Sequence, residues 1–364
     1  MRRPSGKIVA MSGSRDGRRI GGQGPKRTGR GAGRARGPEY LLTFPAGLTR
    51  LVDACLRVDL AGVETRYSDD SALVITSSSP AARVASLPYA KNTFAVLDEV
   101  PRTTFDAAAR TLADRIRTSA PEGLPRMRSF RLMAQVDGQL APLDRRAKEA
   151  LERALAARTG ATVNARGGSG DELWLVGRRD LPRIVLAHRL SKGKRMPAAG
   201  ALSTELSHLL VRLSGPTPDD RFLDPFCGSG ALGRARAASP AASITCSDLD
   251  GEPDLTGTGV RYRTEDALRL ASVDDGSVDV IVTDPPWGEH VGPGAVASDF
   301  YDEMAASFAR VLDPRRGRLV LLMARRREDE VTASLERHGL TLTGAVPLLV
   351  NGHPATALTA LPGR

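Results

Sequence analysis

Apolar residues in the C-terminal half alternate between short continuous runs and longer stretches where they recur every three to four positions. The run Val278–Val282 has the length and β-branching of a buried parallel strand, whereas the longer stretches have the periodicity of amphipathic helices. Strands are predicted at 221–224, 243–248, 259–264, 278–284 and 317–324, and helices at 230–238, 299–312 and 327–339. This alternation predicts an α/β fold, a doubly wound parallel sheet with helices on both faces.

The pattern changes at the end of the chain. Two apolar runs, 341–350 and 354–361, are joined by Asn351-Gly352. Asn-Gly is the strongest short signal for a type I′ hairpin turn, because both residues accept positive φ. We therefore expect the parallel sheet to finish with one antiparallel hairpin. A further amphipathic helix over 202–213 is expected to pack at the sheet edge, just before the first strand.

A glycine-rich loop follows the first predicted strand. Gly228, Gly230 and Gly233 satisfy G-x-G-x-x-G, a pattern of dinucleotide-binding proteins that is weak evidence by itself. Asp248, at the end of the next strand, is placed to bind a ribose hydroxyl of a dinucleotide or of S-adenosylmethionine. Asp224, at the mouth of the loop, would repel a pyrophosphate but attract a methionine ammonium group. The sequence therefore favours S-adenosylmethionine over NAD.

A second loop leaves the fourth predicted strand as Asp284-Pro285-Pro286-Trp287. Proline cannot extend the strand, because it lacks the N–H donor and has a fixed φ. The carboxylate and a proline carbonyl could accept the two N–H groups of a nucleobase amine, and the indole could stack on the base. An Asp-Pro turn beside a core tryptophan is the structural alternative. The glycine loop upstream favours the functional interpretation.

Residues 40–190 have the pattern of an α+β region. Phe105, Ala109, Leu112 and Ile116 recur at helical spacing, after a helix start at Thr103 or Thr104. Helices are also predicted around Leu48–Cys55 and over 143–158, and strands at 72–77, 130–136, 172–176 and 183–188. The pattern alone predicts only a small α+β region before the doubly wound sheet.

The net charge of +10 is concentrated at the N-terminus. Residues 1–38 hold eleven Lys or Arg, one acid (Asp16) and ten glycines, and the remaining chain has 41 basic and 41 acidic residues. A segment with so few large apolar residues is expected to be disordered. It is either a sequence-independent RNA tether acting through phosphates or an incidental extension, with Met11 as an alternative start.

The remaining composition excludes several classes of protein. Cys55, Cys227 and Cys246 are far apart in sequence and form no C-x-x-C motif, which predicts reduced thiols in a cytosolic protein and no metal site. No apolar stretch approaches eighteen residues, so no membrane span is expected. The basic N-terminus lacks the apolar segment of a secretory signal.

Taken together, these motifs resemble those of the THUMP-domain RNA methyltransferases, which methylate the exocyclic N2 of guanine in tRNA or rRNA. The resemblance covers residues from about 40 to 361. It implies a class I methyltransferase domain at 191–364, a THUMP-like RNA-binding domain at 101–190 and a small ferredoxin-like domain at 39–100, behind the tail at 1–38.

The resemblance also implies roles for individual residues. Cofactor binding is expected from Asp224, Phe226, Gly228, Gly230, Asp248 (with Asp250 as a substitute), Asp266 and Ala267, and catalysis from Asp284, Pro285, Pro286 and Trp287. Asp224 would bind the methionine amino group, Asp248 the ribose, and Asp266 the adenine amine.

The sequence departs from the family between the second and third strands. Only eight residues separate Asp250 from Gly259, fewer than a crossover helix needs, so this helix is expected to be reduced to a turn. Near the catalytic loop, Glu289 and His290 are interpreted as loop residues without a special role. The run 325–327 is either a phosphate contact or a solvated group of charges.

The sequence therefore predicts a cytosolic, monomeric methyltransferase that transfers a methyl group from S-adenosylmethionine to guanosine N2, with tRNA as the expected substrate. An adenine-N6 methyltransferase also fits, since that amine presents the same geometry to the Asp284 loop. The sequence is compatible as well with an rRNA guanine-N2 methyltransferase and with a catalytically silent RNA-binding factor.

Overall fold

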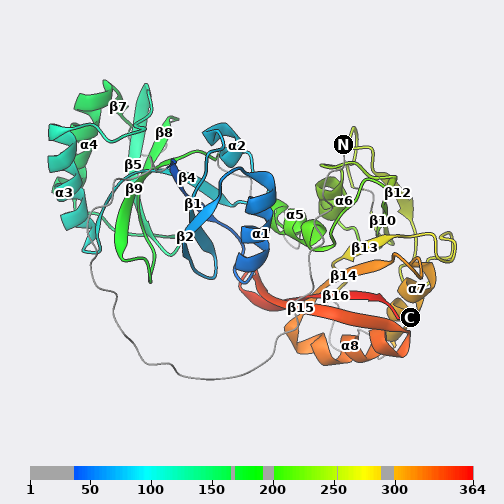
Figure 1. Cartoon of the computed structure of the whole chain (residues 1–364). Coiled ribbons are helices and arrows are strands. Elements are labelled where there is room, and N and C mark those ends of the chain that lie inside the picture. Colours follow the sequence, from blue (N-terminus) through cyan, green and yellow to red (C-terminus); the bar gives the residue numbers. More distant parts are fainter. Residues whose placement is uncertain (1–36, 165–168, 192–200, 252, 288–298, 364) are drawn as a thin grey trace. The chain divides into compact units, whose positions relative to one another are not determined.

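The computed structural model describes residues 37–164, 169–191, 201–251, 253–287 and 299–363 (Figure 1). The chain forms two compact units: an N-terminal unit of residues 35–44 and 52–195, and a C-terminal unit that contains residues 45–51 and 196–364. Most of the basic tail and the pair Glu289 and His290 lie outside the described residues. Within those ranges, no helix is long and apolar enough to span a membrane.

The N-terminal unit is built on one mixed sheet of nine strands. Its elements in chain order are β1 (Glu39–Thr43), α1 (Thr49–Asp59), β2 (Glu64–Ser68), β3 (Ala72–Thr76), α2 (Ala81–Ala85), β4 (Asn92–Pro101), α3 (Phe105–Thr118), β5 (Ser129–Val136), β6 (Gln139–Leu140), α4 (Arg145–Thr159), β7 (Thr162–Val163), β8 (Asp171–Gly177) and β9 (Arg183–Arg189). The strands lie in the order β2-β3-β1-β4-β9-β8-β5-β6, and β7 pairs with β5. Strand β5 pairs in parallel with β7 and β8, and the other pairs of this described sheet are antiparallel.

Helices α3 and α4 cover one face of this sheet (Figure 1). The helices contribute Ala109, Leu112 and Leu151, and the strands contribute Phe130 and Leu173, to one buried apolar cluster. The side chain of Thr104 caps α3 by accepting the N–H of Ala107 at 3.2 Å, as the sequence predicted. The predicted amphipathic periodicity of this helix is therefore its buried face.

Five described strands of the N-terminal unit are not predicted from the sequence: β1, β2, β4 and the two-residue strands β6 and β7. Strand β4 alternates between buried and partly exposed positions and carries polar residues such as Asp98 and Glu99, so it lacks an apolar run. It pairs with β1 on one side and β9 on the other, so one sheet runs through both predicted N-terminal domains. The division at residues 100 and 101 stays a prediction.

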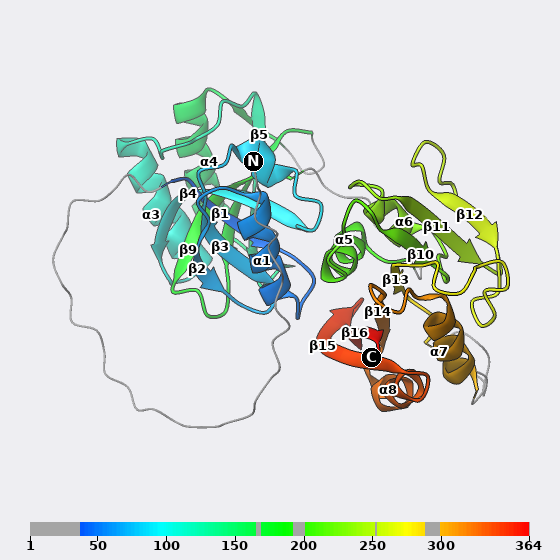
Figure 2. The ribbon, with the colours of Figure 1, turned by 45° about the vertical axis from the view of Figure 1, so that its right-hand side comes forward.

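The C-terminal unit contains a seven-stranded sheet in the order β12-β11-β10-β13-β14-β16-β15 (Figure 2). Its elements are α5 (Thr204–Leu213), β10 (Arg221–Asp224), α6 (Ala231–Arg236), β11 (Ser243–Asp248), β12 (Arg261–Thr264), β13 (Val280–Thr283), α7 (Phe300–Val311), β14 (Arg318–Ala324), the 3₁₀ turn η1 (Arg325–Arg327), α8 (Glu328–Arg337), β15 (Leu340–Val350) and β16 (His353–Pro362). The first five strands pair in parallel, and β16 pairs antiparallel with β14 and β15.

The two faces of this sheet carry different helices. Leu223, Ile281 and Leu321 face α7 and α8, where they join Met304 and Leu335 in one buried cluster. Helices α5 and α6 contact each other and lie on the other face (Figures 1 and 2). The doubly wound class I methyltransferase layout predicted from the sequence is therefore confirmed, with the antiparallel hairpin at its edge.

The hairpin and the shortened crossover also agree with the sequence. Asn351 and Gly352 have φ of 51° and 88°, the positive values of a type I′ turn, between the paired residues Val350 and His353. Between β11 and β12, residues 249–251 and 253–260 form turns and no helix.

Candidate active site

The carboxyl ends of four parallel strands meet at one edge of the C-terminal sheet. Strand β10 is central, with β11 on one side and β13 on the other, so the strand order reverses between β10 and β13. Ligands of open α/β sheets bind in the crevice at such a switch point. Asp224 ends β10 and Asp284 directly follows β13, so the two predicted acids meet at this place.

Asp224 is almost completely buried, with 1% of its surface exposed. The hydroxyl of Thr283 donates to its Oδ1 at 2.9 Å, while Oδ2 has no hydrogen-bond partner among the described residues. Burial raises the pKa of this carboxyl to about 8, and the charges of Asp284 and Asp248 raise it further against the hydrogen bonds. A buried acceptor without a donor is costly. Asp224 is therefore suited to a cationic or N–H-bearing ligand such as the methionine ammonium group.

The loop after Asp224 is anchored by aromatic contacts and backbone bonds. The ring of Phe226 lies 5.9 Å from that of Phe300 and 6.5 Å from that of Phe308, both on α7. The N–H of Cys227 donates to the carbonyl of Ser247 at 3.0 Å. These contacts fix the loop between α7 and the end of β11.

The three glycines of the loop have different roles. Gly228 has φ of +45°, a left-handed conformation that favours glycine, and a Cβ there would meet nothing within 4 Å. At Gly230, with φ of +76°, a Cβ would lie 2.8 Å from Leu255. A Cβ at Gly233 would collide with the sulfur of Cys246. The third glycine therefore allows helix α6 to approach β11, as in dinucleotide-binding folds.

Asp248 lies beside the glycine loop. Its Oδ2 accepts the N–H of Gly228 at 2.7 Å, and its Oδ1 accepts that of Asp250 at 3.3 Å. The next residue, Leu249, is 62% exposed. No sequence motif indicates this apolar side chain, which lies next to the predicted ribose acid and offers a surface for an adenine ring.

The predicted adenine-binding pair forms a tight turn after β12. Asp266 accepts the N–H of Leu268 on its Oδ1 at 3.0 Å, and Ala267 is buried with its carbonyl accepting the hydroxyl of Ser307 at 2.7 Å. The side chain of Asp266 is therefore used within the turn, and its predicted contact with the adenine amine stays a prediction.

The Asp284-Pro285-Pro286-Trp287 loop adopts a defined shape. The indole Nε1 of Trp287 donates to Oδ1 of Asp284 at 2.9 Å. Burial raises the pKa of the Asp284 carboxyl to about 7, against the lowering effect of this hydrogen bond. The indole therefore holds the carboxylate in place, while its predicted stacking on the base stays a prediction.

Neighbouring side chains support this loop from two sides. The hydroxyl of Tyr301 lies 3.5 Å from the carbonyl of Pro286, and the guanidinium of Arg326 donates to the carbonyl of Trp287 at 3.1 Å. Arg326 belongs to the charged run 325–327, which the sequence left between phosphate contact and solvated charge. Its bond to the loop gives it a positioning role that no sequence motif indicates.

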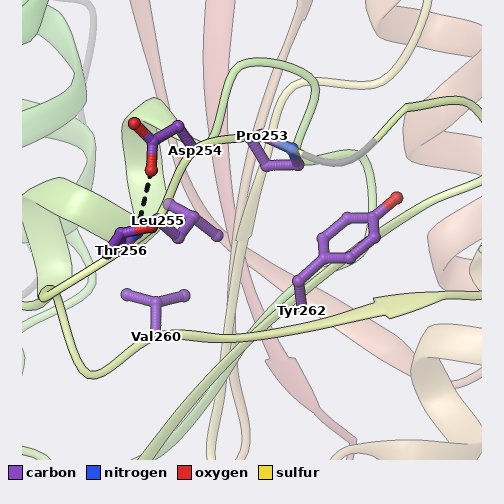
Figure 3. Close-up of a pocket in the computed structure, with 6 residues that line it drawn as sticks. All are labelled: Pro253, Asp254, Leu255, Thr256, Val260 and Tyr262. Carbon is purple, nitrogen blue, oxygen red and sulfur yellow. Dashed lines mark hydrogen bonds between the residues drawn. The ribbon is translucent and has the colours of Figure 1, made fainter.

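A pocket of about 470 Å³ lies beside the glycine loop (Figure 3). It is lined by Pro253, Asp254, Leu255, Thr256, Val260 and Tyr262. These residues come from the shortened connection between β11 and β12 and from the start of β12 itself. Among the described residues, no group of His, Cys, Asp and Glu could hold a metal ion.

A family of known domains is similar to most of the C-terminal unit. The model of the RMKL-like methyltransferase domain matches residues 192–238 and 241–341. The matched segments cover less than half of the chain, and over them the C-terminal unit is similar to this domain. The match includes both the glycine loop and the Asp284 loop.

Two curated relatives carry related names. The human tRNA (guanine(6)-N(2))-methyltransferase THUMP3 is 32% identical over 144 residues, which are 33% of this chain and 28% of that protein. The tRNA (guanine(10)-N2)-dimethyltransferase of Methanothermobacter thermautotrophicus is 36% identical over 101 residues, 24% of this chain and 28% of that protein. The matches thus span less than a third of either relative's length, and they confirm the resemblance to THUMP-type methyltransferases.

A solved structure extends the likeness beyond the methyltransferase domain. The crystal structure of TrmN from Thermus thermophilus superposes with a TM-score of 0.70 and covers 89% of this chain and 99% of that one. The sequence identity is 20%, so the likeness concerns the fold.

Proposed function

We propose that the protein transfers a methyl group from S-adenosylmethionine to the N2 amine of a guanosine in RNA, with tRNA as its substrate. The observation that carries the proposal is the pair of acids at the switch point. Asp224 has a buried oxygen without a partner among the described residues, and Asp284 is held beside an indole. One acid fits an ammonium group and the other fits a base amine, at adjacent strand ends.

The residues of the glycine loop fit the cofactor. Asp224 would accept a hydrogen bond from its ammonium group, which supplies the missing donor. Asp248 would accept the ribose hydroxyls, and the exposed Leu249 would cover the adenine. When bound, S-adenosylmethionine supplies a methyl group already activated by a positive sulfur, so the protein needs no nucleophile of its own.

The second loop fits the methyl acceptor. Ionised Asp284 and the carbonyl of Pro285 would accept the two N–H groups of guanine N2 and orient its lone pair. Methyl transfer would join N2 to the methyl carbon as the carbon–sulfur bond breaks, and Asp284 would accept the proton that N2 loses. Stacking on Trp287, on the order of 1–3 kcal/mol, would offset part of the energy needed to flip the base out of a helix.

The choice of tRNA rests on the similarity to tRNA methyltransferases and on the extra N-terminal unit. A pocket that holds one flipped base reads the base but not its position in the RNA. RNA helices are recognised largely by shape and backbone, so methylation at one site needs a distant anchor. We assign this role to the domains proposed at 39–100 and 101–190, acting on the acceptor end of tRNA. The monomeric state and the cytosolic location stay predictions.

Labelled cofactor tests the reaction. The full chain is incubated with methyl-labelled S-adenosylmethionine and, in separate reactions, with tRNA or rRNA lacking its own modifications, and the RNA is digested to nucleosides. We expect label in N2-methylguanosine. Label in N6-methyladenosine would establish adenine as the acceptor, label in rRNA alone would exclude tRNA, and cofactor binding without transfer to any RNA would indicate a silent factor.

The proposed anchor is tested on the substrate. The same assay is run with intact tRNA and with tRNA shortened at its 3′ end, which keeps the target base but removes the part that the N-terminal unit would grip. We expect the KM to rise for the shortened RNA while kcat changes little. Equal KM values would contradict the role of the N-terminal unit.

A further inference from the structure

The connection between β11 and β12 lacks the crossover that a doubly wound sheet normally has. Parallel strands are usually joined by a helix, which covers one face of the sheet and holds the loop at the carboxyl end of the strand. Here residues 249–251 and 253–260 form turns, and the pocket of about 470 Å³ lies between the connection and β12 (Figure 3). Asp248, which begins this connection, therefore needs another support.

The side chain of Tyr262 provides one support from β12. Its hydroxyl donates to the carbonyl of Gly251, and it lies 3.4 Å from the carbonyl of Asp248. Its ring packs against the buried cluster that contains Cys246 and Leu255. Figure 3 shows Tyr262 lining the same pocket as Leu255 and Pro253. One phenol thus ties the start of the connection to the neighbouring strand.

The side chain of Arg234 provides a second support from α6. Its Nη2 donates to the carbonyl of Ser229 in the glycine loop at 2.6 Å, and its Nη1 donates to the carbonyl of Asp254 in the connection at 3.3 Å. The planar guanidinium can reach both carbonyls at once, which a lysine ammonium cannot do in the same way. Arg234 therefore ties the glycine loop to the middle of the connection.

The two supports meet at Asp248. This residue bonds to Gly228 of the glycine loop at 2.7 Å, so the loop and the connection form one hydrogen-bonded unit. We propose that Arg234 and Tyr262 are positioning residues that replace the missing crossover helix and hold Asp248 and the glycine loop in the geometry for S-adenosylmethionine. This inference rests on the cofactor assigned under the proposed function.

Single substitutions test the inference through affinity. Tyr262→Phe removes one hydroxyl and Arg234→Lys removes one of the two carbonyl contacts, so both full-length variants should remain folded. We expect each to weaken the binding of S-adenosylhomocysteine, measured by calorimetry, about three- to tenfold, the worth of one hydrogen bond. The controls are Tyr89→Phe, which loses a hydroxyl bond to Asp59 in the N-terminal unit, and Arg261→Lys, an exposed change on β12. Both controls should bind as the wild type does.

Measuring Tyr262→Phe with and without Asp248→Ala distinguishes a positioning role of Tyr262 from a general effect on stability. We expect Tyr262→Phe to weaken affinity less than about twofold when Asp248 is already alanine, because the group that it positions is then gone. An equal loss in both backgrounds, or wild-type affinity in both variants, would overturn the inference and leave the proposed function intact. A wild-type protein that does not bind S-adenosylhomocysteine would overturn both. If Tyr262→Phe unfolds, Arg234→Lys in the same two backgrounds decides the outcome by the same criterion.

Discussion

The buried acids at the two edges of the C-terminal sheet differ in whether they pair with a cationic side chain. At the amino edge, Asp279 precedes β13 and accepts hydrogen bonds from Arg221 at 2.8 Å and Arg316 at 2.7 Å. Burial alone would raise its pKa, but the hydrogen bonds and charge of Arg221 lower it to about 2. Asp220 precedes β10 and pairs with Arg318 at 2.6 Å. These acids are satisfied within the protein.

At the carboxyl edge, the acids of the same two strands have no cationic partner within the part of the chain that the structure describes. The pKa of Asp224 is raised to about 8 and that of Asp284 to about 7, in both cases mainly by burial. Acids with strongly raised pKa values are candidates for function. Burying a carboxyl group without a cationic partner lowers the stability of the fold, and a bound ligand can offset this loss. Ion pairing of the acids at the amino edge stabilises the fold, whereas the unpaired acids at the carboxyl edge are available to a ligand.

The largest expected effect is on the reaction at the unpaired edge. Asp284→Asn keeps the size of the side chain but removes the charge that orients the amine and accepts its proton. We expect the rate of methyl transfer to fall about a hundredfold or more, the usual worth of a general base, with affinity for S-adenosylhomocysteine unchanged. The exposed Asp275→Asn is the control. A near-normal rate for Asp284→Asn would show that this acid is not catalytic.

Asp224→Asn should weaken cofactor binding without lowering the stability of the protein at about pH 8. The raised pKa means that folded Asp224 holds a proton that the unfolded chain releases above about pH 4, so wild-type stability falls as the pH rises from about 4 to 8. We expect the variant to show a shallower fall and at least wild-type stability at about pH 8. Its affinity for S-adenosylhomocysteine should weaken by about 1.5–3 kcal/mol, the worth of a hydrogen bond to a charged group. Retained affinity would contradict the ammonium site.

At the amino edge, a substitution should lower stability and leave cofactor binding unchanged. Asp279→Asn loses charged hydrogen bonds from Arg221 and Arg316, so the C-terminal unit should lose about 2 kcal/mol of unfolding free energy at pH 7 in urea. Because the folded pKa of Asp279 is lowered to about 2, its stabilisation is complete above about pH 4 and is lost as the pH falls toward 2. The deficit should therefore shrink at about pH 3, while cofactor affinity stays normal. Weaker cofactor affinity in Asp279→Asn without a loss of unfolding free energy would contradict the proposed difference between the two edges.

The smallest expected effect concerns the indole. Trp287→Phe keeps an aromatic face for stacking but removes the N–H that lowers the pKa of Asp284. Since the ionised acid is the active form, the wild-type rate should rise with pH through about 7. In the variant this rise should move to higher pH, so that the rate falls several-fold at about pH 6.5 and little at about pH 8.5. An unshifted pH profile would mean that the indole acts only by stacking.

The sequence predicts much of the C-terminal fold because its signals are local. Strand β13 is a continuous apolar run, and the turn at Asn351-Gly352 needs two positive φ values that few other pairs allow. Strand β4 is missed because its partners β1 and β9 lie far away in sequence, and pairing rather than composition makes it a strand.

The sequence predicts which residues form the candidate site but not the hydrogen bonds that hold them. The motifs identify Asp224 and Asp284 from the loops that carry them. The sequence does not show that Thr283 bonds to Asp224, or that Arg326 holds the carbonyl of Trp287, because these contacts depend on strand order and on a turn 39 residues away. Arg234 and Tyr262 are missed for the same reason.

Proton release on cofactor binding tests most directly whether the unpaired edge is a ligand site. Titrating S-adenosylhomocysteine into the protein at pH 7, in buffers of different ionisation enthalpy, measures the protons exchanged by calorimetry. Free Asp224, with its pKa of about 8, is mostly protonated at this pH, and the bound ammonium group would require it to ionise. We predict release of close to one proton by the wild type. Binding without proton release, or no binding, would contradict the account.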